Sequence, residues 1–183
     1  IVFGDWSSDV CSSDLTRIGN WIAPRLEKFE IILFVVFIIS IMLRTSTDLP
    51  VVLLLVVSLM TLSTLYFFAA FASINDEYAG GMEIFLHKLA SWSCSIVLVG
   101  ALFRIQMWPG SKLLLQLGCI NLIIALPIIL YTNSKNTELQ FFNVRYILRL
   151  VFILGLGLFL TFASKDVLLK YKIISIAAGI KLK

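Results

Sequence analysis

The sequence has little charge for its length: only 14% of its 183 residues are charged, whereas 60% are hydrophobic. A soluble domain carries about 25% charged residues, so the composition excludes an ordinary water-soluble protein. The sequence also has one histidine and no Cys-x-x-Cys motif among its three cysteines. These absences argue against a Ser-His-Asp arrangement, a disulfide framework and a zinc site. We therefore predict no enzyme activity, no cofactor and no metal.

Long apolar runs make up most of the sequence. A helix needs about 20 mostly apolar residues to cross the roughly 30 Å hydrocarbon core, so the shorter runs must borrow flanking residues. The fold class predicted is all-α: an integral membrane helical bundle with about five transmembrane helices. We expect a membrane domain over residues 16–183, with hairpin one at 29–72, hairpin two at 86–131, a fifth helix at 146–163 and a basic tail at 164–183.

The head of the chain differs from the rest. Residues 5–15 read DWSSDVCSSDL, which is polar and lacks periodicity. The same eleven residues are one translation frame of a common sequencing-adapter read. We therefore interpret residues 1–15 as an adapter artefact, expect them to be disordered, and exclude them from fold reasoning.

The two hairpins resemble each other. When Arg44 is set on Arg104, LRTSTDLPVVLLL lies on FRIQMWPGSKLLL, a spacing of 60 residues. An arginine closes a short helix, a proline opens a long one, and three leucines follow in both segments. A repeat of two helices preserves orientation, so the pattern predicts a parallel duplication, with chance similarity of leucine-rich helices as the alternative.

Basic residues predict the side of the membrane. The net charge of +4 fits lysines and arginines that flank membrane spans rather than a nucleic-acid interface. Six lie on the side of the N-terminal flank, against three in the two tight turns, which favours a cytoplasmic N-terminus. Lysines of the tail would then face outward, which argues the other way. We expect the partners to be the lipid bilayer and, beyond it, a second copy or another membrane protein.

Arg104, Trp108, Pro109 and Gly110 form the most informative motif. Trp108 suits the headgroup level, Pro109 fixes φ, and Gly110 permits a tight turn. Two interpretations stay open at this point. The motif is a hairpin cap, or Arg104 belongs to an ion or partner site within the bundle.

The segment GALFRIQMWPGSKLLLQLG resembles the turn in the N-terminal two-helix module of the gliding-motility family GldL, which shows a Phe-(Lys/Arg)-x-x-His-Trp-Pro-Gly pattern. The resemblance covers roughly Val97 to Ile123. It implies a bacterial inner-membrane protein, and a family whose helices form a proton-powered motor with a partner called GldM. Arg104 matches the basic position. Met107 stands where the family has histidine, and Leu113–Tyr131 has no carboxylate, so the resemblance implies kinship of the hairpin rather than of the motor activity.

Four further polar residues lie in or near apolar runs: Arg44, Gln116, Asn121 and Arg149. Arg149 either marks the interface or pairs with Asp76, Glu77 or Glu138. We expect His87 to be interfacial and exposed. Gly155 and Gly157 are expected to allow close helix packing.

These features predict a structural or interaction role in a complex of the inner membrane. The alternative is a small transporter or ion-conducting subunit, in which Arg44, Arg104 and Arg149 would line a polar path with Gln106, Gln116 and Asn121.

Overall fold

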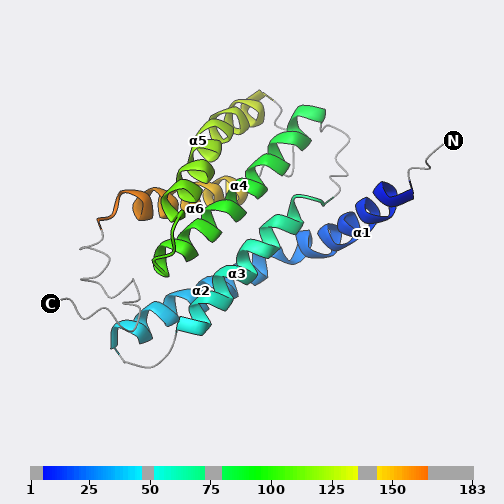
Figure 1. Ribbon diagram of the computed structural model, residues 1–183. Helices are drawn as coiled ribbons and strands as arrows, with labels where there is room; N and C mark the ends of the chain where they lie inside the picture. The colour runs from blue at the N-terminus through cyan, green and yellow to red at the C-terminus, as the bar shows by residue number, and fades with distance from the viewer. Residues whose placement is uncertain (1–5, 47–51, 73–79, 136–143, 165–183) are drawn as a thin grey trace.

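The computed structural model describes residues 6–46, 52–72, 80–135 and 144–164 of the chain (Figure 1). Every regular element in these ranges is helical, as the sequence predicts. The helices are α1 (Trp6–Ile22), the 3₁₀ turn η1 (Ala23–Arg25), α2 (Leu26–Ser46), α3 (Val52–Ala69), α4 (Gly81–Ile105), α5 (Ser111–Lys135) and α6 (Val144–Phe162). The basic tail expected at 164–183 lies outside the described residues from position 165 onward.

Within the described ranges, three helices, α4, α5 and α6, are long and apolar enough to cross a membrane. The apolar part of α3, Leu53–Ala69, is shorter. In α2, Glu27, Lys28 and Glu30 interrupt the first turns. The membrane helical bundle is therefore confirmed, while only three of about five expected spans meet this test of length and composition.

Helix α4 is the centre of the bundle and packs against α3, α5 and α6. It buries 13 of its 25 residues, whereas α5, of the same length, buries 7. Many of the buried residues of α4 are small: Ala90, Ser91, Ser93, Cys94, Ser95, Gly100 and Ala101. Small side chains let neighbouring backbones approach closely, which is how helices associate when lipid removes the hydrophobic drive. Helix α2 packs on α3, and α1 also contacts α3.

Glycines bring α4, α5 and α6 together at one crossing. A Cβ atom on Gly118 of α5 would lie 2.5 Å from Val97 Cγ2 and 3.0 Å from the Val97 backbone nitrogen on α4. A Cβ atom on Gly157 of α6 would lie 2.7 Å from Cys119 Sγ and 2.8 Å from Val97 Cγ1. A Cβ on Gly155 would meet nothing within 4 Å. The expected close packing is thus right for Gly157 and wrong for Gly155, which faces outward.

The outer surface is apolar, which is the reverse of a soluble bundle. Side chains between 50% and 61% exposed form a stripe along α5 at helical spacing: Leu113, Leu117, Ile120 and Ile124. Similar large apolar side chains are exposed on α2, α3 and α6. Contiguous apolar surface of this kind is rare on soluble monomers. The exposed apolar side chains of these helices are the feature that indicates a membrane protein.

Several helix boundaries differ from the prediction. Residues 6–15, expected to be disordered, continue α1 toward the N-terminus, because no glycine or proline interrupts the chain between 6 and 18. Helix α4 starts at Gly81 rather than 86, since MEIFLHK is helical and Gly80 ends the preceding connection. The prediction also made the first helix of each hairpin shorter than the second. Instead, α2 has 21 residues against 18 in α3, and α4 and α5 have 25 each.

The first helices of the two hairpins, α2 and α4, run in a similar direction. The end of α2 and the α4–α5 turn lie toward the same end of the bundle, at the lower left of Figure 1. The connection between α2 and α3, at residues 47–51, lies outside the described residues. The 60-residue sequence duplication itself stays a prediction.

Candidate functional site

The Arg104–Gly110 segment is a Schellman turn joined to the start of α5. The Trp108 backbone N–H donates to Phe103 O at 2.8 Å and the Met107 N–H donates to Arg104 O at 3.2 Å, the two bonds that define this motif. The rings of Phe103 and Trp108 meet edge to face at 5.0 Å, which supplies its usual apolar contact. Gly110 adopts φ 82°, as the tight turn requires, and its carbonyl accepts from the Leu114 N–H. Glycine adopts this positive φ without the steric cost that a Cβ atom brings.

Met107 occupies the left-handed position of this turn, with φ 59°. Glycine is the usual residue there, because a Cβ atom disfavours that conformation by roughly 1–2 kcal/mol. Asn, Asp and His tolerate positive φ better than other residues do. The conformation therefore gives a backbone reason, independent of proton transfer, for histidine at this position of the GldL pattern.

Arg104 is buried, with 4% of its surface exposed. Its Nε donates to Leu160 O at 3.3 Å and its Nη2 donates to Ala163 O at 2.9 Å, both at the end of α6. A cation that binds the last carbonyls of a helix satisfies them and opposes the negative end of the macrodipole. Arg104 thus fastens the α4–α5 turn to α6, which agrees with the structural interpretation of the motif.

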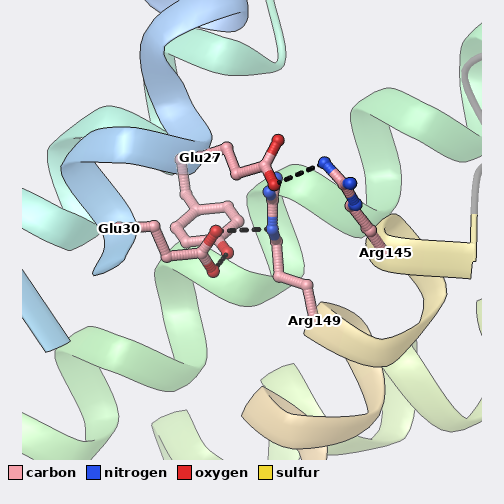
Figure 2. A network of polar contacts seen from close by, with 5 residues as sticks. Glu27, Glu30, Arg145 and Arg149 are labelled. Carbon is pink, nitrogen blue, oxygen red and sulfur yellow. Dashed lines mark hydrogen bonds and ion pairs between the residues drawn. The ribbon is translucent and has the colours of Figure 1, made fainter.

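A second polar cluster lies at the opposite end of the bundle and joins three helices (Figure 2). Arg149 of α6 donates from Nε to Glu30 Oε2 of α2 at 2.6 Å. The hydroxyl of Tyr66, on α3, donates to Glu30 Oε1. Both carboxylate oxygens of Glu30 are therefore bound, each by a different helix.

The Glu30–Arg149 pair is much less exposed than the neighbouring Glu27–Arg145 pair. The side chains of Arg149 and Glu30 are 15% and 14% exposed. Arg145 and Glu27, one turn toward the helix starts, form a 2.9 Å pair whose side chains are 74% and 51% exposed. An exposed pair contributes at most about 1 kcal/mol, whereas removal of one partner from a buried pair costs about 3–5 kcal/mol. Glu30–Arg149 is therefore the electrostatic tie between α2 and α6.

Around this pair the helices carry further polar and aromatic groups. The His87 ring on α4 stacks on the Tyr146 ring of α6, with centroids 5.6 Å apart and planes at 19°. His87 is half-buried, so the expected exposed position is wrong: α6 covers it. Ser63 of α3 bonds to Ser95 of α4 through the hydroxyl at 2.9 Å and the carbonyl oxygen at 3.1 Å.

The other predicted site residues are dispersed. Arg149 does not mark a bare interface; its observed partner is Glu30, and the expected partners Asp76, Glu77 and Glu138 lie outside the described residues. Gln116 is exposed on α5 and Asn121 is half-buried. Arg44 lies in the last turn of α2, which ends at Ser46, and its side chain is outside the described part. Arg104 contacts α6 about 16 Å along the helix from Arg149, so the structure does not bring these two arginines together.

Sequence reasoning missed Glu30 and Tyr66. Glu30 sits in WIAPRLEKFE, a stretch whose charges indicate an interfacial lead-in. Tyr66 stands among phenylalanines in a continuous apolar run. One signal was available: an arginine one turn inside α6 needs an acidic partner at the same depth, and Glu30 is the acidic residue nearest to the start of an apolar run.

Metal chemistry finds no support in the described ranges, where no three His, Cys, Asp or Glu residues gather to hold an ion. Cys94 and Cys119 are buried free thiols. The polar groups instead tie helix to helix at two levels, one at each end of the bundle.

Comparison with protein families gives one match. Residues 89–126 match the family model of the GldL N-terminal domain. The matched segment is about a fifth of the chain and runs from α4 through the Schellman turn into α5, so it contains Arg104, Trp108, Pro109 and Gly110. It supports a relationship between hairpin two and GldL. Neither the curated proteins nor the solved structures gave a match.

Proposed function

We propose that this protein is a multi-pass subunit of the bacterial inner membrane that serves a structural or interaction role in a membrane complex. The matched hairpin supports a relationship to gliding-motility machinery, and the described part of the chain is built from helix-to-helix ties. Helix α5 carries no carboxylate, so the proposed role excludes that of a proton-driven motor helix.

The observation that carries the proposal is the exposure of Gln116 on the outer face of α5. It is exposed on α5, inside the apolar stripe that includes Leu113, Leu117 and Ile120. A carboxamide that faces lipid leaves its hydrogen bonds unmade, and glutamine favours helix association in membranes by roughly 1–2 kcal/mol in model helices. The outer face of α5 is therefore the surface that we expect a neighbouring helix to cover, from a second copy or another membrane protein.

The test is association in native membranes. We expect cross-linking through a photoreactive residue at Ile120, followed by mass spectrometry, to capture a neighbouring membrane helix. Gln116→Leu should weaken the captured species about tenfold, because the interhelical hydrogen bonds are lost.

Thr132→Val is the matched control. It also removes a polar group from the exposed surface of α5, but the Thr132 hydroxyl already bonds to Ile128 O of its own helix at 2.8 Å. Its cross-links should be unchanged. Monomer alone at Ile120 in the unmodified protein, or equal loss in both variants, would contradict the proposed role.

One observation favours a second candidate function, a small transporter or ion-conducting subunit. Ionisable residues within membrane helices often mark ion pathways, and Glu30–Arg149 is a largely covered ion pair near the starts of α2 and α6. Proton or ion flux in liposomes that disappears in Glu30→Gln would favour this function. Arg104→Ala would then test whether the turn belongs to the same path.

A further inference from the structure

A cleft of about 480 Å³ opens between α2 and α6, next to the ion pairs. Its size is within the roughly 300–1,000 Å³ of small-molecule sites. Four charged side chains lie at one end, Glu27 and Glu30 from α2 and Arg145 and Arg149 from α6 (Figure 2). The remaining walls are apolar: Ile31, Phe34, Leu148 and Phe152.

The cleft runs along α2 and α6, from the starts of the two helices toward the middle of the bundle. The charges belong to the first turns of α2 and α6, which begin at Leu26 and Val144. Phe152 lies seven residues after Arg145, about 10 Å further along α6. The rings of Phe34 and Phe152 meet there at 4.8 Å. The cleft is thus polar at headgroup depth and apolar toward the bilayer centre, which is the polarity of a phospholipid.

We propose that this cleft binds one phospholipid with a zwitterionic phosphoethanolamine headgroup. The phosphate lies against Arg145, the primary ammonium against Glu27, and one acyl chain follows the apolar walls past Phe34 and Phe152. This site is separate from the proposed interaction face, because Gln116 on α5 is not part of the cleft.

Charge complementarity selects this headgroup. Two guanidinium and two carboxylate groups give the cleft mouth no net charge, like the lipid. Arginine presents a planar set of donors that fits phosphate oxygens. The Glu27–Arg145 pair is 51% and 74% exposed, so each member can give up the other for a ligand group. The Glu30–Arg149 pair is only 14–15% exposed; it stays paired and forms the inner edge of the cleft.

Two other headgroups fit less well. Phosphatidylcholine carries the same charges, but its quaternary ammonium has no N–H to donate to Glu27. Phosphatidylglycerol offers a phosphate without any cation, which leaves the Glu27 carboxylate beside an added negative charge. The cleft therefore distinguishes lipids of identical acyl chains by headgroup alone.

The experiment is native mass spectrometry of the purified full chain, titrated with phosphatidylethanolamine, phosphatidylcholine and phosphatidylglycerol of one acyl composition. We expect phosphatidylethanolamine to bind about tenfold more tightly than phosphatidylcholine, the effect of one charge-assisted hydrogen bond. Glu27→Gln should reduce this preference, and Arg145→Gln should weaken binding of both lipids.

Two further variants keep the test decisive. Leu148→Trp fills the apolar part without changing the charges, and it should abolish retention of all three lipids while the helical circular dichroism persists. Lys135→Gln removes an exposed cation at the end of α5, on the same side of the bundle and outside the cleft, and should leave binding unchanged.

Equal binding of the three lipids would overturn the proposal, as would a phosphatidylethanolamine preference that survives Glu27→Gln. Preference for phosphatidylglycerol, or a protein helix cross-linked at Leu148, would assign the cleft to an anionic lipid or to a partner instead. These outcomes are independent of the Gln116 experiment, so either proposal can fail alone.

Discussion

Replacement of Glu30 with alanine is expected to cost about 3–5 kcal/mol of folding free energy, the largest loss from any single substitution considered for this protein. The change leaves Arg149 charged in a site where its side chain is only 15% exposed, and it also removes the acceptor of the Tyr66 hydroxyl. The measurement is unfolding in detergent followed by tryptophan fluorescence, with a helical signal by circular dichroism as the check that the variant folds.

Two comparisons show whether burial is the cause. Glu27→Gln breaks the neighbouring exposed pair and should cost less than about 1 kcal/mol. The double variant Glu30→Leu with Arg149→Met removes both charges and should recover most of the loss, because an apolar pair of similar size is often as stable as a buried ion pair. A double variant as unstable as Glu30→Ala would show that the pair is not the source of the effect.

Gly118→Ala carries the second large expected effect, about 1–3 kcal/mol of lost stability. The added methyl group would lie 2.5 Å from Val97 Cγ2 and 3.0 Å from the Val97 backbone nitrogen. A β-branched side chain and a helix backbone have little freedom to move away, so α4 and α5 must separate at the crossing. A lowered midpoint of thermal unfolding in detergent is the expected readout.

Gly155→Ala is the matched control, because it makes the same change in a membrane helix at a position with open space around the new methyl group. Its unfolding midpoint should be equal to that of the unmodified chain or higher, since alanine favours helix over glycine by up to about 1 kcal/mol. Equal destabilisation by both variants would mean that helix packing at Gly118 is not as tight as the structure has it.

The helices were predictable because lipid imposes a simple rule on sequence. Each uncharged run needs a helix to satisfy its backbone, and Pro109 and Gly110 mark the turn between two of them. The ends were less predictable. The prediction began hairpin two at residue 86, whereas the apolar residues of MEIFLHK continue α4 back to Gly81. The polar head was assigned disorder from composition, whereas its backbone forms the start of α1.

The candidate site was only half predictable, for a reason of distance along the chain. Trp108, Pro109 and Gly110 act within one turn, so local chemistry reveals them. Glu30 and Arg149 are 119 positions apart, and the residues around either one do not indicate that it pairs with the other. Likewise, the sequence marks Arg104 as a charge beside a turn, but only packing shows that it binds Leu160 O and Ala163 O of α6.

The most direct test of the whole account is the sidedness of α5 in the membrane. Its 25 residues span about 37 Å, more than the hydrocarbon core. Single cysteines placed at Lys112 and Lys135, both exposed in the structure, are labelled with a membrane-impermeant maleimide in right-side-out and inverted vesicles, and the unmodified chain supplies the background. We predict that each position is labelled in only one kind of vesicle, and that the two positions require opposite kinds. Labelling of both positions from the same side would contradict a bundle that crosses the bilayer.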